Sequence, residues 1–191
     1  MLNKLTLSDE KKHLLNIFIS LLFTCVCYKL KSQSVDTSKL FPTQGHKQIS
    51  ILKTINVNAD SLKMLLVVPN SNTWLIWGKK LNYFNEVMTI ADFEKNIIAK
   101  GLTEKIPGIS DRIGLYKAYV NYRPYVILSN TTKAIGTKRY QIRLNLYDPK
   151  RADLIFQNEV EVNLLWESYS DLKILYPLFN SLVDFLNRQV N

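Results

Sequence analysis

Two segments of alternating apolar and polar residues lie close together in the last third of the chain. The apolar positions are Tyr140, Ile142, Leu144 and Leu146 in the first segment and Leu154, Phe156, Val160 and Val162 in the second. Because successive side chains of a strand point to opposite faces, each segment predicts a strand with one apolar face and one wet face. Asp148-Pro149 supplies the turn chemistry between them. The pattern predicts an antiparallel hairpin that is covered on one side.

A helical stripe follows the hairpin and is expected to supply that cover. Its apolar residues recur at spacings of three and four: Leu172, Leu175, Phe179, Leu182, Leu186 and Val190. Ser170 fits an N-cap, and Trp166 just before it is expected to anchor the helix on the sheet. Pro177 lacks the N–H of a helix interior, so a kink or a fresh helix start is expected there. The polar residues Asp184, Asn187 and Arg188 are expected to face water.

The stretch from Ser61 to the hairpin mixes strand and helix signals. It predicts a buried strand over 62–68 and a short strand over 73–77. A helix is expected from the Thr89/Asp92 capping pair to Gly101, followed by a short helix that is capped by Ser110 and carries Ile113 and Tyr116. A strand over 122–128 and a loop over 130–138 complete this stretch. The predicted fold class is therefore α/β (α+β), with a single mixed, largely antiparallel sheet covered on one face by two main helices. A length of 191 residues fits one domain, assigned to 61–191, behind a polar extended lead-in over 35–60.

The first 34 residues are predicted to be a targeting segment. Lys4, Lys11 and Lys12 precede an uncharged, largely apolar run over 14–28. A run of that length fits the ~7–15-residue core of a signal peptide better than the ~20 residues of a membrane span. Cleavage is predicted after Ser34 or Ser32. Lysines at 29 and 31 are unfavourable for translocation, which leaves a retained membrane anchor as an alternative.

Both cysteines, Cys25 and Cys27, lie in this segment. Residues 22–25 resemble a bacterial lipobox ending at Cys25, so lipidation of Cys25 is a third outcome, although Thr24 stands where Gly, Ala or Ser is usual. Cleavage removes both thiols, which excludes a disulfide or thiol nucleophile in the mature domain. All three outcomes place the domain outside the cytoplasm, in the periplasm or associated with the cell envelope, the outer membrane included.

The residue inventory favours a protein that is not an enzyme. One histidine, His46, remains after cleavage, and the sequence offers no phosphate-cradling loop and no cluster with metal-ligand spacing. We therefore expect no catalytic residue, no metal and no cofactor. The mature chain has 20 basic and 14 acidic residues, a net charge of +6 scattered as short pairs. This charge is a weak basis for nucleic-acid binding, which is not expected.

Aromatic residues interleaved with lysines form the one candidate binding segment. Its members are Trp74, Trp77, Lys79, Lys80 and Tyr83. Exposed aromatic rings beside lysines can stack on bases or sugars. On a strand, however, Trp74 and Trp77 face opposite sides, so at least one of them is expected in the core.

The order of elements from Leu62 resembles the small α/β modules of Gram-negative envelope proteins. The local likeness is strongest where the strand 144–148 turns into 154–156, and the glycine usual late in that turn is replaced by Arg151-Ala152-Asp153. This group includes the TolB amino-terminal domain, the curli-secretion lipoprotein and the lipoprotein activators of penicillin-binding proteins. The resemblance implies an adaptor role in the envelope.

These observations lead to one main hypothesis and two alternatives. The main one is an exported, non-enzymatic adaptor or accessory protein that binds another envelope protein and touches the membrane only through its N-terminal segment. The first alternative is a cell-wall-directed hydrolase or carbohydrate-binding protein, and the second is an extracellular nucleic-acid binder. A flat apolar patch rimmed by polar residues would favour the main hypothesis, an adaptor protein. A cleft with two facing carboxylates would favour the hydrolase.

Overall fold

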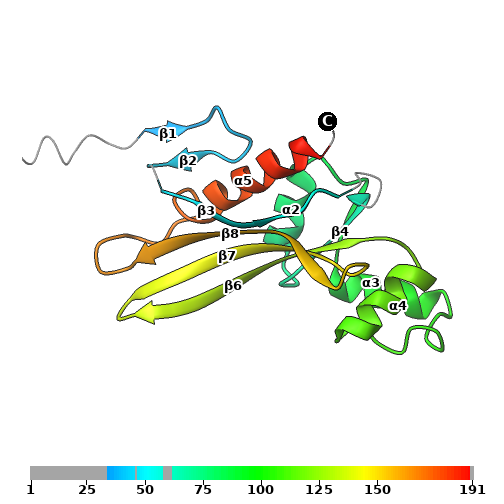
Figure 1. Cartoon of the computed structure of the whole chain (residues 1–191). Coiled ribbons are helices and arrows are strands. Elements are labelled where there is room, and N and C mark those ends of the chain that lie inside the picture. The colour runs from blue at the N-terminus through cyan, green and yellow to red at the C-terminus, as the bar shows by residue number, and fades with distance from the viewer. Residues whose placement is uncertain (1–33, 46, 58–61, 190–191) are drawn as a thin grey trace, which may run out of the picture. The chain divides into compact units, whose positions relative to one another are not determined.

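The structure is a computed structural model that describes residues 34–45, 47–57 and 62–189. The predicted signal peptide, the candidate lipidation site Cys25, His46 and Val190 lie outside the described residues. A six-stranded sheet with the strand order β3-β8-β7-β6-β4-β5 forms the centre of the described part, beside a two-stranded sheet of β1 and β2 (Figure 1). This mixed α/β architecture with a largely antiparallel sheet is the predicted fold class.

The predicted hairpin is present and sets the register of the sheet. Strand β7 (Arg139–Asp148) pairs antiparallel with β8 (Asp153–Asn163), and Asp148 is the partner of Asp153 at the closed end. The Asp148 carboxylate accepts the backbone N–H of Lys150 at 2.8 Å, which is the local turn bond that the Asp-Pro pair predicts. Ile142, Leu144 and Leu146 are buried on one face, as expected, whereas Tyr140 of the same set is only partly buried.

Three further strands extend the sheet beyond β7. Strand β6 (Val126–Gly136) pairs antiparallel with β7, whereas β4 (Met64–Val67) lies parallel to both β6 and β5 (Glu86–Thr89). The predicted buried strand over 62–68 is therefore confirmed as β4. The loop predicted over 130–138 is wrong for 130–136, because these polar residues continue β6 along its partner β7, and only 137–138 form a turn. An antiparallel sheet can expose one face to water, so polar residues are compatible with a strand there.

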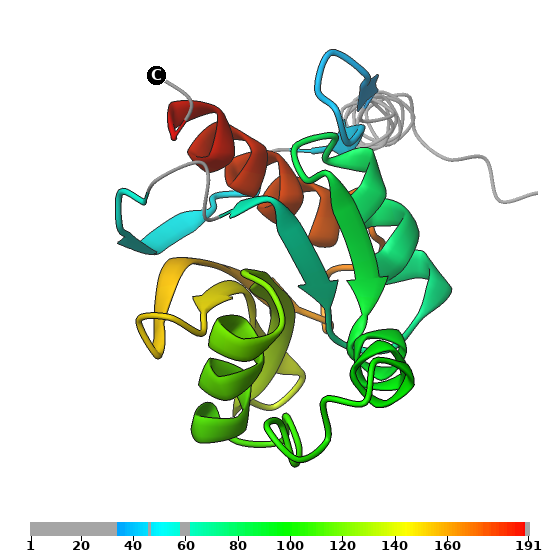
Figure 2. The same cartoon turned by 90° about the vertical axis from the view of Figure 1, so that its right-hand side faces the viewer.

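Helices cover both faces of the sheet rather than one. Helices α2 (Asn72–Lys80) and α5 (Leu175–Arg188) pack with Leu65 and Val67 of β4, and α3 (Ile90–Ala99) and α4 (Arg112–Asn121) pack with Leu66 on the opposite face (Figure 2). The two long helices predicted to share a face, α3 and α5, lie on opposite faces. A fully buried strand such as β4 has no polar face, so its sequence does not tell on which side each helix packs.

The C-terminal helix covers the hairpin as predicted. Leu175, Phe179, Leu182 and Leu186 are buried, together with Leu178 and Phe185, whereas Leu172 of the predicted stripe lies before the helix and is only partly buried. Asp184, Asn187 and Arg188 are exposed. The helix starts at Leu175, so Pro177 stands in its first turn, where a missing N–H costs no helix bond. Ser170 is not the N-cap; that position is Ile174, without a side-chain cap.

The lead-in is part of the folded unit, contrary to its interpretation as an extended segment outside the domain. It forms β1 (Val35–Asp36), β2 (Thr43–Gln44) and β3 (Ser50–Thr54), and β3 pairs antiparallel with β8 as an edge strand of the main sheet. Phe41 is fully buried against Tyr176 and Phe179 of α5, with ring centroids 5.5 and 5.0 Å away. The sequence of the lead-in does not predict this contact, because it is polar and aperiodic and a single aromatic residue makes the contact.

None of the helices in the described ranges combines the length and the apolarity that crossing a bilayer requires.

Candidate functional site

The predicted aromatic binding segment is a helix whose tryptophans point inward. Ser71 caps α2 by accepting the N–H of Trp74, and a helix places residues three apart on one face. Trp74 and Trp77 are consequently both buried, with ring centroids 5.5 and 5.4 Å from that of Phe179. The short strand predicted over 73–77 is wrong. Ser71 before apolar residues at 74, 77 and 81 was the sequence signal for this helix.

The other members of the segment do not form a stacking surface either. Lys79 and Lys80 are exposed at the end of α2, and the Lys80 Nζ lies 5.0 Å from the ring centroid of Phe41. Tyr83 is partly buried, and burial raises the pKa of its hydroxyl. The premise of the binding prediction, exposed aromatic rings beside lysines, does not hold for Trp74 and Trp77.

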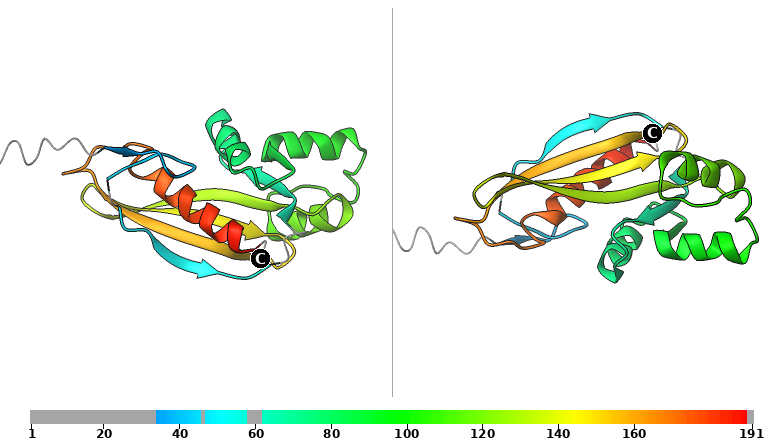
Figure 3. Two further views of the ribbon diagram at one scale, coloured as in Figure 1. Left: turned by 90° about the horizontal axis from the view of Figure 1, so that it is seen from above. Right: turned by 90° about the horizontal axis from the view of Figure 1, so that it is seen from below.

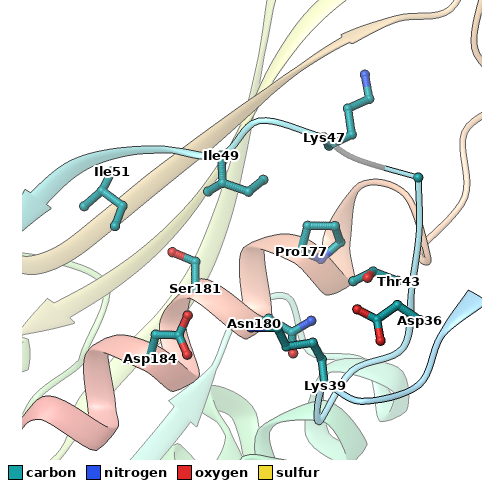
Figure 4. Close-up of a pocket in the computed structure, with 11 residues that line it drawn as sticks. Asp36, Lys39, Thr43, Lys47, Ile49, Ile51, Pro177, Asn180, Ser181 and Asp184 are labelled. Atoms are coloured by element: carbon teal, nitrogen blue, oxygen red, sulfur yellow. The ribbon is translucent and has the colours of Figure 1, made fainter.

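A polar groove lies between the β1–β2 segment and helix α5. It has a volume of about 420 Å³, and its lining includes two carboxylates, Asp36 and Asp184, and two lysines, Lys39 and Lys47. Figure 4 shows Asp36 and Asp184 on either side of Asn180 along the groove. The two carboxylates come from different elements, β1 and α5.

The acidic residues on the open face of the hairpin are occupied by basic neighbours. Glu159 accepts from Arg143 at 2.9 Å, and Glu161 accepts from Arg139 at 3.2 Å. Within the described ranges, no three His, Cys, Asp or Glu side chains are gathered so that they could hold a metal ion. These contacts are those of a solvated sheet surface.

Helix α4 carries an exposed apolar stripe. Ile113, Tyr116 and Val120 follow one another at spacings of three and four, and 68%, 49% and 59% of their surfaces are exposed. The inner side of the helix is formed by small residues: a Cβ on Gly114 would lie 2.0 Å from the carbonyl oxygen of Gly108, and Ala118 is fully buried. The sequence places Ile113 and Tyr116 on this helix, but Asp111 rather than Ser110 is its N-cap.

A second exposed apolar cluster lies on the loop between β8 and α5, here called the 164–169 loop. Its four large side chains are Leu164, Leu165, Trp166 and Tyr169, with exposed fractions of 37%, 52%, 85% and 54%. The expectation that Trp166 anchors the C-terminal helix on the sheet is wrong, because Phe179 and Phe185 of α5 already fill the space under that helix. No sequence signal distinguishes an exposed tryptophan from a buried one in a loop.

Comparisons with known proteins give no family. No protein-family model matches the chain, and no curated protein is similar to it. Similar solved structures include a PelC variant dodecamer from Paraburkholderia phytofirmans, with 8% identity and a TM-score of 0.39 over 74% of this chain and 98% of that chain. Another is the lipoprotein GNA1162 from Neisseria meningitidis, with 18% identity and a TM-score of 0.33 over 68% of this chain and 99% of that chain. These similarities do not confirm the resemblance to the TolB group.

Proposed function

We propose that this chain is an exported, non-enzymatic accessory protein of the cell envelope that binds a partner protein through helix α4. The observation that carries the proposal is the exposed stripe of Ile113, Tyr116 and Val120. Clustered large apolar side chains in water are typical of interaction sites, whereas scattered single ones are not. The uncharged N-terminal run behind Lys4, Lys11 and Lys12 supports the export.

The stripe is held on a fixed support. The backbone oxygen of Leu115 accepts the hydroxyl of Tyr125 at 2.9 Å, and Tyr125 is fully buried under the helix. The close approach of Gly114 to Gly108 fixes the start of the helix against the preceding loop. A helix held in this way presents its outer side chains without a further ordering cost, which favours binding.

The charge around the stripe defines the partner's chemistry. Arg112 and Lys117 are exposed on α4, and the helix itself contains no acidic residue. We expect the partner to offer an apolar groove with an acidic rim, because opposite charges at the rim select the partner and its orientation.

Site-specific photocrosslinking tests this function in the intact envelope. A benzoylphenylalanine residue at position 116 is expected to form an adduct with a different protein, and Val120→Lys is expected to abolish that adduct. The same residue at position 187, on the exposed face of α5, is the matched control and is expected to give no such adduct. An adduct with the mass of two copies of this chain, or adducts unaffected by Val120→Lys, would contradict the proposal.

The free energy of unfolding of the Val120→Lys variant is measured in the same experiment. Because Val120 is largely in water, Val120→Lys should change the free energy of unfolding by no more than about 0.5 kcal/mol. Loss of the adduct without loss of stability therefore reports on binding.

A further inference from the structure

The 164–169 loop exposes several large apolar side chains to water. Trp166 is 85% exposed and Leu165 is 52% exposed, although the fold buries all its other tryptophans. Tryptophan combines a large apolar ring with an N–H donor, and it is enriched where one side of a surface is apolar and the other is wet, as at the membrane interface.

Hydrogen bonds tie this loop to two other segments at the same end of the sheet. The N–H of Leu164 donates to the carbonyl of Lys138 in the β6–β7 turn at 2.8 Å, and Lys47 forms an ion pair with Glu167. Three residues after the loop, the carbonyl of Leu172 accepts the N–H of Gln44 in β2 at 3.0 Å. Figure 3 shows the loop, the β6–β7 turn and β1 together at one end of the sheet, away from α3 and α4.

The chain enters the folded unit at this end. The apolar run over 14–28 is followed by only the six residues 29–34 before Val35 begins β1. A fully extended chain spans at most ~3.6 Å per residue, so this connection reaches no farther than about 25 Å. The retained anchor, which is the alternative to cleavage after Ser32 or Ser34, would keep a bilayer within this reach of the end that carries Trp166, and a lipid on Cys25, ten residues before Val35, would keep it within about 36 Å.

The charges in this region suit a lipid surface. Lys29 and Lys31 lie in the connection itself, and Lys133 and Lys138 are exposed at the far end of the β6–β7 hairpin. Basic side chains near a bilayer are attracted to anionic head groups.

We propose that the 164–169 loop enters the head-group region of the bilayer that holds the N-terminal segment. Trp166 and Leu165 are the inserted side chains, and Lys138 lies at the lipid phosphates. A single lipid chain or short apolar run binds a membrane weakly, so a second contact from the domain increases retention and fixes its orientation. This goes beyond the expectation that the N-terminal segment alone touches the membrane, and it leaves α4 at the end of the sheet that points away from the bilayer.

Fluorescence of Trp166 in the full chain tests the proposal. The chain is reconstituted into vesicles of phosphatidylethanolamine and phosphatidylglycerol, with and without lipids brominated near the head group. The emission of Trp166 is obtained as the difference between the wild type and Trp166→Phe, since the emission of Trp74 and Trp77 in the core is common to both. We expect this difference emission to shift to shorter wavelength on reconstitution and to be lost with brominated lipid.

Two variants that each introduce an aspartate test whether the 164–169 loop is the surface that inserts. Leu165→Asp is expected to abolish the shift and the quenching while the N-terminal segment still holds the chain in the vesicles. Ile113→Asp, which charges the exposed stripe at the other end, is the matched control and is expected to leave both unchanged.

The opposite results overturn the proposal. Trp166 emission that stays at long wavelength and accessible to acrylamide in reconstituted protein would show that the loop remains in water. A short-wavelength Trp166 emission that brominated lipid does not quench would show that protein covers the loop instead, either a second copy or this chain itself.

Discussion

Asn180 joins two segments that are 139 residues apart in the sequence. Its side chain lies on the inner side of α5, where its Nδ2 donates to the carbonyl of Phe41 at 2.7 Å and its Oδ1 accepts the N–H of Phe41 at 3.0 Å. Phe41 is fully buried, so both of its backbone groups depend on this one amide. A buried polar residue of this kind holds the lead-in against the domain.

Replacing Asn180 by Ala should destabilise the protein. The substitution leaves the buried N–H and carbonyl of Phe41 without their partner, which costs about 1–3 kcal/mol of unfolding free energy. Urea unfolding measures the loss, and Asn187→Ala on the exposed side of the same helix is the control, with a change of about 0.5 kcal/mol at most. Equal effects of the two variants would mean that water replaces the Asn180 amide.

Tyr125 gives the protein a dependence on alkaline pH. Burial raises the pKa of its hydroxyl well above the ordinary value of 10.0. The folded state then keeps the proton where the unfolded chain loses it, so this contribution to stability is complete below pH 10 and is lost as the pH rises above it. Tyr125→Phe should remove up to about 1.4 kcal/mol per pH unit from the slope of unfolding free energy against pH. Urea titrations at pH 9 to 12 measure both slopes, and parallel curves would contradict the assignment.

At the scale of elements, the C-terminal helix packs its apolar side on the hairpin. Phe185 stacks on Phe156 of β8 with ring centroids 4.8 Å apart, and Asn158 of β8 donates to the carbonyl of Leu178 at 2.9 Å. The helix therefore combines packing with a hydrogen bond to the sheet.

Truncating one residue of this stripe should have a large effect. Leu182 is fully buried, so Leu182→Ala should lower the unfolding free energy by about 2–5 kcal/mol through lost contacts and a cavity. Thermal and urea denaturation measure the change, with the exposed Asp184→Ala as the control. A small effect of Leu182→Ala would mean that the helix is not part of the cooperative core.

Helix α4 depends on a close backbone contact. A Cβ at Gly114 would lie 2.0 Å from the oxygen of Gly108, so Gly114→Ala should force the helix away from the preceding loop and lower the melting temperature, despite alanine's higher helix propensity. Gly108→Ala meets nothing within 4 Å and is the matched control. A melting temperature of Gly114→Ala at or above the wild-type value would show that the loop yields freely.

At the scale of the whole domain, residues 35–54 belong to the folding unit. The unit therefore begins at Val35 and not at Ser61. Strand β3 covers the edge of β8, and Phe41 fills the core beneath α5. Removing this cover would leave an unpaired edge strand and an exposed apolar surface.

A chain that begins at Ser61 should therefore lose cooperative folding or aggregate, whereas one that begins at Val35 should melt in a single transition. Calorimetry together with sedimentation distinguishes the two outcomes. If the chain that begins at Ser61 melts as a monomer near the melting temperature of the chain that begins at Val35, the lead-in is a linker outside the folding unit.

The sequence alone determined the hairpin and the C-terminal helix. Their side chains repeat with period two and with spacings of three and four, and both elements pack against their neighbours in the chain. Local periodicity reports which face of an element is apolar, so the burial of Leu144 and Leu182 followed from it.

Only the tertiary structure decided which apolar faces are covered. At least one of Trp74 and Trp77 was expected in the core, and both are inside, whereas Trp166 was expected to pack on the sheet and is exposed, as is the α4 stripe. Strand β3 and Phe41 find their places through contacts more than a hundred residues away. The physical reason is that periodicity is a property of the segment, but burial depends on whether another segment occupies the space above it, and that is set by the packing of the whole chain.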